Sequence, residues 1–186
     1  RSEGIEVKGL RQSLYHARVH PRSRSCPIPR NPAMRFFNTE GPVRSDLHYC
    51  LPPLHRWNLD DVLTLVERQK YFLLHAPRQT GKTSCLLALM EHLNREGRYR
   101  AVYANIEGAQ PAREDVDRGM AAICSVLGRS ARLYLRDGRL ADWYRDGGAT
   151  VPADDRLAQL LEFWAAADPR PAVLLLDEVD ALVGDT

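Results

Sequence analysis

The stretch of this 186-residue chain that most constrains its fold is a short apolar run that leads through a tight loop into an amphipathic segment. Residues 71–75 read YFLLH, which predicts a short buried strand of a parallel sheet. From Lys82 to about Glu96, leucine and methionine recur at helical spacing, and Gly97 is a typical residue to follow a helix. We therefore predict a strand, a loop at residues 76–81, and a helix, in that order.

Further segments alternate along the chain in the order typical of a parallel α/β sheet. Asn58 is predicted to cap a helix, and Gly128 and Asp154 are predicted to end one helix and to cap another. Residues 129–153 give no firm pattern. The predicted helices are 59–69, 82–96, 111–127 and 154–167, and the predicted strands are 71–75, 100–106 and 172–177.

The amino-terminal 33 residues differ from the rest in composition. Residues 1–30 carry seven Lys or Arg against two Glu, contain several prolines and show no sustained helical or strand period. Three interpretations compete: a nucleic-acid-binding arm, a basic targeting peptide, or sequence extraneous to the native protein. We favour the third, and expect residues 1–33 to be disordered or extraneous and residues 34–186 to form one partial domain.

The bulk composition is that of an ordinary globular chain, with 44% hydrophobic and 27% charged residues. No apolar run reaches the roughly 18 residues that a membrane span needs, so we expect no membrane association. The four cysteines are far apart and include no C-x-x-C pair, which predicts reduced thiols and a cytoplasmic location. They are Cys26, Cys50, Cys85 and Cys124.

The loop nearly matches the pattern G-x-x-x-x-G-K-[ST], which describes loops that bind phosphate groups. Ala76 stands in place of the first glycine; it adds one methyl group at a strand end, where it is tolerable unless its φ is positive. Backbone N–H groups around Gly81 and the start of the helix would form a concave anion site. The predicted ligand-binding residues are Ala76, Pro77, Arg78, Gln79, Thr80, Gly81, Lys82, Thr83 and Ser84.

A second motif, VLLLDEVD at residues 173–180, places two acids directly after a predicted buried strand. Ligands of open α/β sheets bind at this end of the strands. Asp177 is therefore a candidate to hold Mg²⁺ together with the hydroxyl group of Thr83. Glu178 is a candidate catalytic residue that orients or deprotonates an attacking water. A solvated strand end is the alternative for the acidic pair taken alone.

Together, APRQTGKTS and VLLLDEVDAL resemble the Walker A and Walker B motifs of P-loop ATPases, with an added catalytic glutamate. Within that group the chain resembles the AAA-like, origin-recognition-related ATP-binding proteins of bacteria and archaea. The segment FFNTEGPVRSDLHYCLPPLHR is similar to the lead-in of bacterial members. The resemblance covers residues 34–186.

This resemblance implies a P-loop NTPase three-layer sandwich with a parallel sheet, here truncated after the Walker B strand. It implies ATP and Mg²⁺ as ligands, with Lys82, Thr83, Asp177 and Glu178 in the roles given above. It also implies an adenine pocket made partly by the lead-in, with candidates Tyr49, Leu51 and Pro52.

In the complete protein, ATP hydrolysis would drive a conformational switch, helped by an arginine finger from a neighbouring subunit of a homo-oligomer. A DNA or protein client is a candidate partner that the sequence does not identify. The alternatives are a nucleotide-binding switch or DNA-associated adaptor with little hydrolysis, and a kinase or GTPase that uses the same loop.

Overall fold

The computed structural model divides into two compact units, residues 1–88 and 89–186, and each is described by itself. The residues that the structure describes are 6–9, 36–37, 47–77, 79–112 and 115–182. Among them, no helix is long and apolar enough to cross a membrane.

The first unit contains the predicted strand–loop–helix segment. Its elements are the strands β1 (Glu6–Gly9) and β2 (Phe72–His75), the 3₁₀ helix η1 (Pro53–Arg56), the helix α1 (Leu59–Glu67), and the start of α2 (Lys82–Glu96). A strand and a helix are confirmed at the predicted places, as β2 and α2. The prediction that β2 is a buried strand of a parallel sheet is wrong, since it pairs antiparallel and Leu73 and His75 are exposed. A short apolar run does not show the direction of the strand with which it pairs. Asn58 precedes α1 as predicted, but its side chain donates to Asp61 Oδ2 at 2.7 Å instead of capping the backbone.

Strand β2 pairs antiparallel with β1, with Glu6 opposite His75 and Gly9 opposite Phe72. Strand β1 therefore lies within residues 1–33, where the sequence shows no sustained strand period. A four-residue strand is too short to show a period, and its pairing depends on a partner far along the chain. The rest of that segment lies outside the described residues, so its predicted disorder or extraneous origin stays a prediction.

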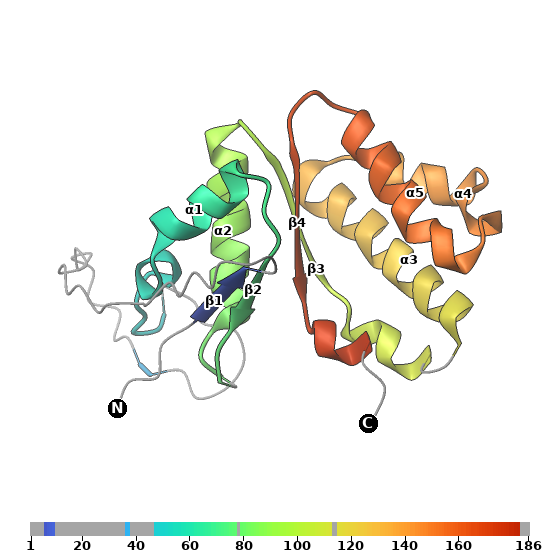
Figure 1. The fold of residues 1–186 in the computed structure, drawn as a ribbon. Coiled ribbons are helices and arrows are strands. Elements are labelled where there is room, and N and C mark those ends of the chain that lie inside the picture. Colours follow the sequence, from blue (N-terminus) through green and yellow to red (C-terminus); the bar gives the residue numbers. More distant parts are fainter. Residues whose placement is uncertain (1–5, 10–35, 38–46, 78, 113–114, 183–186) are drawn as a thin grey trace. The chain divides into compact units, whose positions relative to one another are not determined.

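The second unit contains the strands β3 and β4, which pair in parallel in register from Arg100–Ala172 to Asn105–Asp177. This confirms an α/β fold with a small parallel sheet (Figure 1). The elements in chain order are β3 (Arg100–Asn105), η2 (Glu107–Ala112), α3 (Val116–Leu135), α4 (Arg139–Arg145), η3 (Gly148–Thr150), α5 (Ala153–Ala166), β4 (Ala172–Asp177) and η4 (Val179–Leu182).

The predicted bounds of the helix 111–127 are wrong, because helix α3 spans Val116–Leu135. It begins after Asp115, whose side chain accepts from the Arg118 N–H at 3.0 Å, and it continues through Gly128. A Cβ at Gly128 would lie 3.2 Å from backbone atoms of Ala141 in α4, so this glycine permits close helix packing and does not end the helix. The chain leaves α3 at Arg136, which has a left-handed φ of 54°.

Helix α5 also begins differently from the prediction. Pro152 is its N-cap, and Asp154 lies in the first turn, where an acid suits the helix dipole.

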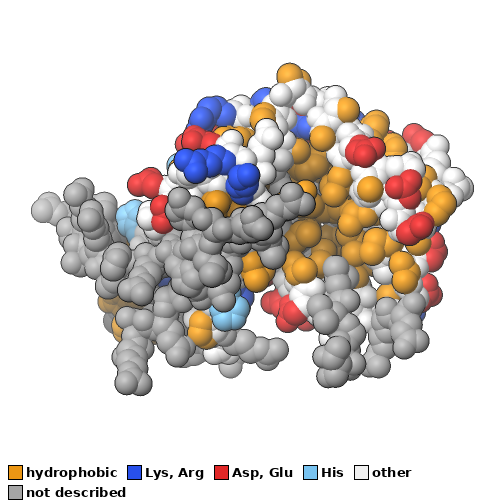
Figure 2. Space-filling model, viewed as in Figure 1, with side chains coloured by type: hydrophobic (Ala, Val, Ile, Leu, Met, Phe, Trp, Pro, Cys, Tyr) orange, Lys and Arg blue, Asp and Glu red, His pale blue; other side chains and the backbone are white. Residues whose placement is uncertain are grey.

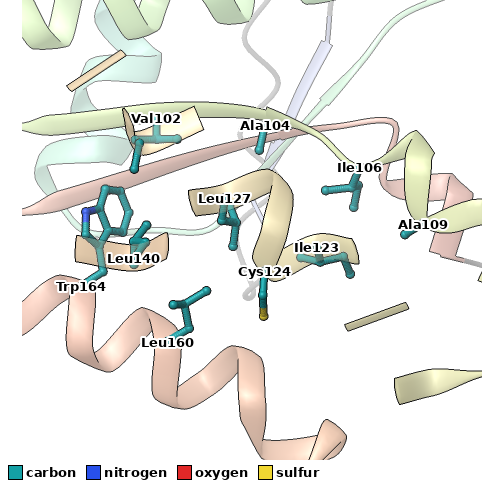
Figure 3. Packing of buried hydrophobic residues seen from close by; sticks show 11 residues of the cluster. Val102, Ala104, Ile106, Ala109, Ile123, Cys124, Leu127, Leu140, Leu160 and Trp164 are labelled. Carbon is teal, nitrogen blue, oxygen red and sulfur yellow. The ribbon is translucent and has the colours of Figure 1, made fainter. Parts of the chain in front are cut away.

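The core of the second unit lies between one face of the sheet and the helices. Helix α3 packs against β3, and α4 and α5 pack against α3. Figure 3 shows side chains from both strand and helices converging on this cluster. Its buried members are Val102, Ala104, Ile106, Ala109, Ile123, Cys124, Leu127, Ala131, Leu140, Leu160 and Trp164.

The aromatic pair Trp143 and Tyr144 packs against this core, so these rings are structural. The Trp143 ring stacks on Phe163 with centroids 6.3 Å apart. On the face seen in Figure 2, acidic side chains are frequent where α4 and α5 lie.

Candidate functional site

The loop after β2 accommodates alanine where the motif has its first glycine. Ala76 is buried, with 8% of its surface exposed, and its φ is not positive. Its methyl group is therefore placed without backbone strain, since only a left-handed φ would penalise a Cβ at this position. The departure from the motif at Ala76 leaves the backbone of the loop undisturbed.

The backbone from Gln79 to Lys82 alternates in handedness. Gln79 and Gly81 have φ values of 60° and 84°, whereas Thr80 and the helical Lys82 do not have positive φ. Such alternation turns successive N–H groups towards one side and creates an anion-binding concavity, called a nest. The N-terminus of α2 begins at the same point, and the Gly81 carbonyl accepts from the Cys85 N–H at 3.0 Å. The loop therefore combines a nest with the positive end of a helix.

The side chain of Lys82 is held back along this loop. Its Nζ donates to the Ala76 carbonyl oxygen at 3.0 Å and lies 3.4 Å from that of Pro77. The Thr80 hydroxyl donates to the same Pro77 oxygen at 2.7 Å. Thr83 is exposed in the first turn of α2, followed by the half-buried Ser84. Except for Arg78, which lies outside the described residues, the predicted loop residues are thus gathered at one helix terminus.

Arg56 is a further loop residue that the sequence motif does not reveal. A Cβ built on Gly81 would lie 2.6 Å from Arg56 Nη1, so the guanidinium group rests against the Gly81 backbone. Glycine is required at this position both for its positive φ and for this close approach. Arg56 comes from η1, and only the tertiary fold brings its positive charge to the loop.

Cys85, in the first turns of α2, is fully buried and contacts the Pro53 carbonyl oxygen through Sγ at 3.4 Å. Burial raises the pKa of this thiol, and the nearby charge of Arg56 opposes the rise only partly. Cys85 therefore remains a protonated, structural thiol at neutral pH.

In the second unit, Asp177 ends β4 with its carboxylate fixed at both oxygens. The side chain is buried, with 5% of its surface exposed. Oδ2 accepts from the Tyr103 hydroxyl at 3.0 Å, and Oδ1 accepts from the Glu178 N–H at 3.1 Å. Tyr103 lies on the neighbouring strand β3. The sequence motif does not identify it, because pairing of β3 with β4 creates the contact.

Glu178 follows with its side chain exposed and its backbone in the left-handed region, at φ 58°. A non-glycine residue in this conformation is strained by about 1–3 kcal/mol, and such residues cluster at functional sites. This backbone conformation changes the direction of the chain after β4. The acidic side chain of Glu178 therefore faces solvent, next to the buried Asp177.

The predicted site residues thus form two sets. Residues 76–84 surround the start of α2 in the first unit, and Asp177 and Glu178 lie at the carboxyl end of β4 in the second. Within the described part of the chain, no group of three or more His, Cys, Asp or Glu side chains is arranged to hold a metal ion.

No protein-family model, no curated protein and no solved structure matches this chain. Its function is therefore inferred from its own residues and their geometry.

Proposed function

We propose that this chain belongs to a P-loop ATPase, with the three-layer sandwich of that class, which binds ATP and Mg²⁺ and hydrolyses the nucleotide to drive a conformational switch. The observation that carries the proposal is the alternating handedness of residues 79–82 at the N-terminus of α2, directly after a strand. A phosphate chain supplies the charge and the many acceptor oxygens that such a concavity binds.

In this proposal Lys82 leaves its carbonyl partners and contacts the β- and γ-phosphates. The Arg56 guanidinium beside Gly81 adds a second positive charge at the loop. Thr83 and Asp177 are the residues that would hold Mg²⁺, which would offset the negative charge of the phosphate oxygens. Glu178 orients or deprotonates the attacking water.

The same proposal assigns the lead-in around Tyr49 to the adenine base and an arginine of a neighbouring subunit to the transition state. Tyr49 and Leu51 are exposed, and the Tyr49 ring lies 5.0 Å from that of Phe37. These exposed aromatic rings offer a surface on which a base can stack.

Titration of the chain with Mg²⁺–ATP tests the loop. Lys82→Ala is expected to weaken ATP binding about 10- to 100-fold, because it removes a charge-assisted contact to phosphate. Lys70→Ala is the matched control, since Lys70 is an exposed lysine just before β2. Isothermal titration calorimetry measures both affinities. Equal affinities of the two variants, or no ATP binding by the wild type, would exclude the proposed phosphate site.

Tyr103→Phe tests the acidic strand end. The variant loses the hydroxyl donor that fixes Asp177 Oδ2 and keeps the aromatic ring. Residues that orient a metal ligand typically change metal affinity 10- to 100-fold when mutated, so about a tenfold higher Mg²⁺ requirement for ATP binding is expected. The measurement is ATP affinity against Mg²⁺ concentration. Tyr99→Phe, just before the start of β3 and away from Asp177, serves as the control. An unchanged Mg²⁺ midpoint for Tyr103→Phe would contradict the assigned role of Asp177.

A further inference from the structure

A polar cavity lies at the end of β3 opposite Asp177. Its volume is about 500 Å³, and residues from the start of β3, the end of α3, the α3–α4 turn and the segment before β4 line it. Four arginines are among the lining residues: Arg100, Arg136, Arg139 and Arg170. The cavity belongs entirely to the second unit and includes no residue of the loop after β2.

Arg100 is the most buried of these arginines, with 2% of its side chain exposed. Its Nη2 donates to the Trp164 carbonyl oxygen at 2.7 Å, and its guanidinium carbon lies 5.3 Å from the Trp164 ring centroid. Nε and Nη1 have no hydrogen-bond partner. The nearest acidic oxygens are 3.7 Å away on Asp137 and 3.8 Å away on Asp168, beyond hydrogen-bond distance. Unsatisfied donors on a buried charge are rare in native proteins and costly.

The Asp137 carboxylate is already bound by another arginine. Both its oxygens accept from Arg139, at 2.8 and 2.7 Å. The hydrogen bonds from Arg139 hold the pKa of Asp137 below its ordinary value, so the carboxylate stays ionised and paired at neutral pH. The remaining Arg139 donor, Nη1, bonds to the Ala167 carbonyl oxygen.

Asp168 is paired in the same way with Arg170, at 3.0 and 2.9 Å. The hydrogen bonds from Arg170 hold the pKa of Asp168 well below its ordinary value. The four guanidinium groups therefore face two carboxylates, which leaves a formal charge of +2 at the cavity. Asp137 and Asp168 make their short contacts with Arg139 and Arg170 and only longer ion-pair contacts with Arg100, whose charge they share.

Arg136 stands at the mouth of the cavity, exposed and in the left-handed conformation that ends α3. In the described part of the chain its guanidinium group has no ion pair or hydrogen bond. The cavity is thus lined by one buried and one exposed arginine whose N–H groups include donors without a hydrogen-bond partner, and its walls are mostly polar.

We propose that this cavity binds a small phosphate-bearing molecule, whose phosphate oxygens accept from Arg100 and Arg136. A phosphate group carries up to two negative charges, which matches the charge of +2, and its oxygens provide acceptors in several directions. The cavity is larger than a bare phosphate ion. Its polar lining suits a ligand whose non-phosphate part carries hydroxyl groups, such as a sugar. The site is independent of the proposed ATPase function, because it uses neither the loop nor the acidic end of β4.

The test uses the full chain carrying Lys82→Ala, so that phosphate binding at the loop is weakened. Inorganic phosphate and ribose 5-phosphate are titrated while tryptophan fluorescence is followed, because Arg100 lies over the Trp164 ring. Saturable binding of either probe is expected. Tighter binding of the sugar phosphate identifies a phosphate ester as the ligand class, and equal binding identifies free phosphate.

Arg136→Asn is the decisive variant, since substitution of the buried Arg100 could disturb folding. Asparagine tolerates the left-handed conformation and removes only the charge and its donors. About a tenfold weaker affinity is expected, as for loss of hydrogen bonds from a charged group. Arg129→Gln, an exposed arginine of α3 outside the cavity, is the matched control and should leave the affinity unchanged. Absence of saturable binding in the Lys82→Ala chain, or equal affinities of the Arg136→Asn and Arg129→Gln variants, would overturn the proposal.

Discussion

Glu178→Gln is expected to lower ATP turnover by about 10²- to 10⁴-fold, the usual contribution of a general base, while ATP affinity stays within a factor of a few. Glutamine keeps the shape of the side chain but cannot take a proton from water. The fold should be unaffected, because the Glu178 side chain is exposed and its backbone N–H still donates to Asp177 Oδ1. The measurement is phosphate release from Mg²⁺–ATP, with ATP affinity determined in parallel.

Asp180→Asn provides the control for this experiment. Asp180 is an exposed acid in η4, two residues after Glu178, and its loss changes the local charge by the same amount. Turnover should stay near that of the wild type. If the wild type and Glu178→Gln bind ATP but hydrolyse it equally slowly, Glu178 is not a catalytic base. The chain is then a nucleotide-binding switch or adaptor, the alternative that the sequence leaves open.

Local sequence pattern predicted most of the elements that carry the candidate site. Strands β2, β3 and β4 are short apolar runs, and α2 has apolar residues at helical spacing, so neighbouring residues suffice to define them. Gly128 shows where this method fails. It resembles a helix stop in sequence, but it lies inside α3, where tertiary contact with α4 determines its role.

The sequence motif selects the residues of the candidate site but does not predict their geometry. The motif names Gly81 and Lys82, because each has a chemical task that few residue types perform. The motif does not show that Gln79 adopts a positive φ. It also does not show that Arg56 lies against Gly81 or that Tyr103 donates a hydrogen bond to Asp177. Those relations depend on contacts between segments distant in sequence.

Arg156→Met is expected to lower the free energy of unfolding by about 2–4 kcal/mol, the largest effect on stability that we predict. The Arg156 side chain is 4% exposed in α5. Its Nε and Nη2 donate to the Val151 carbonyl oxygen at 3.0 and 2.8 Å, and Nη2 also lies 3.2 Å from that of Ala149. Methionine fills a similar volume but leaves these carbonyl groups of the η3 segment without a donor.

Asp117→Asn separates the two kinds of contact that Arg156 makes. Asp117 Oδ1 accepts from Arg156 Nη2 at 2.7 Å, but the Asp117 side chain is 72% exposed, so the ion pair itself should contribute about 1 kcal/mol or less. Urea unfolding followed by tryptophan fluorescence measures both variants. If Asp117→Asn lowers the free energy of unfolding as much as Arg156→Met does, the ion pair accounts for most of the stabilisation. A much smaller loss places the stabilisation in the bonds to the backbone, where a buried arginine organises the turn between α4 and α5.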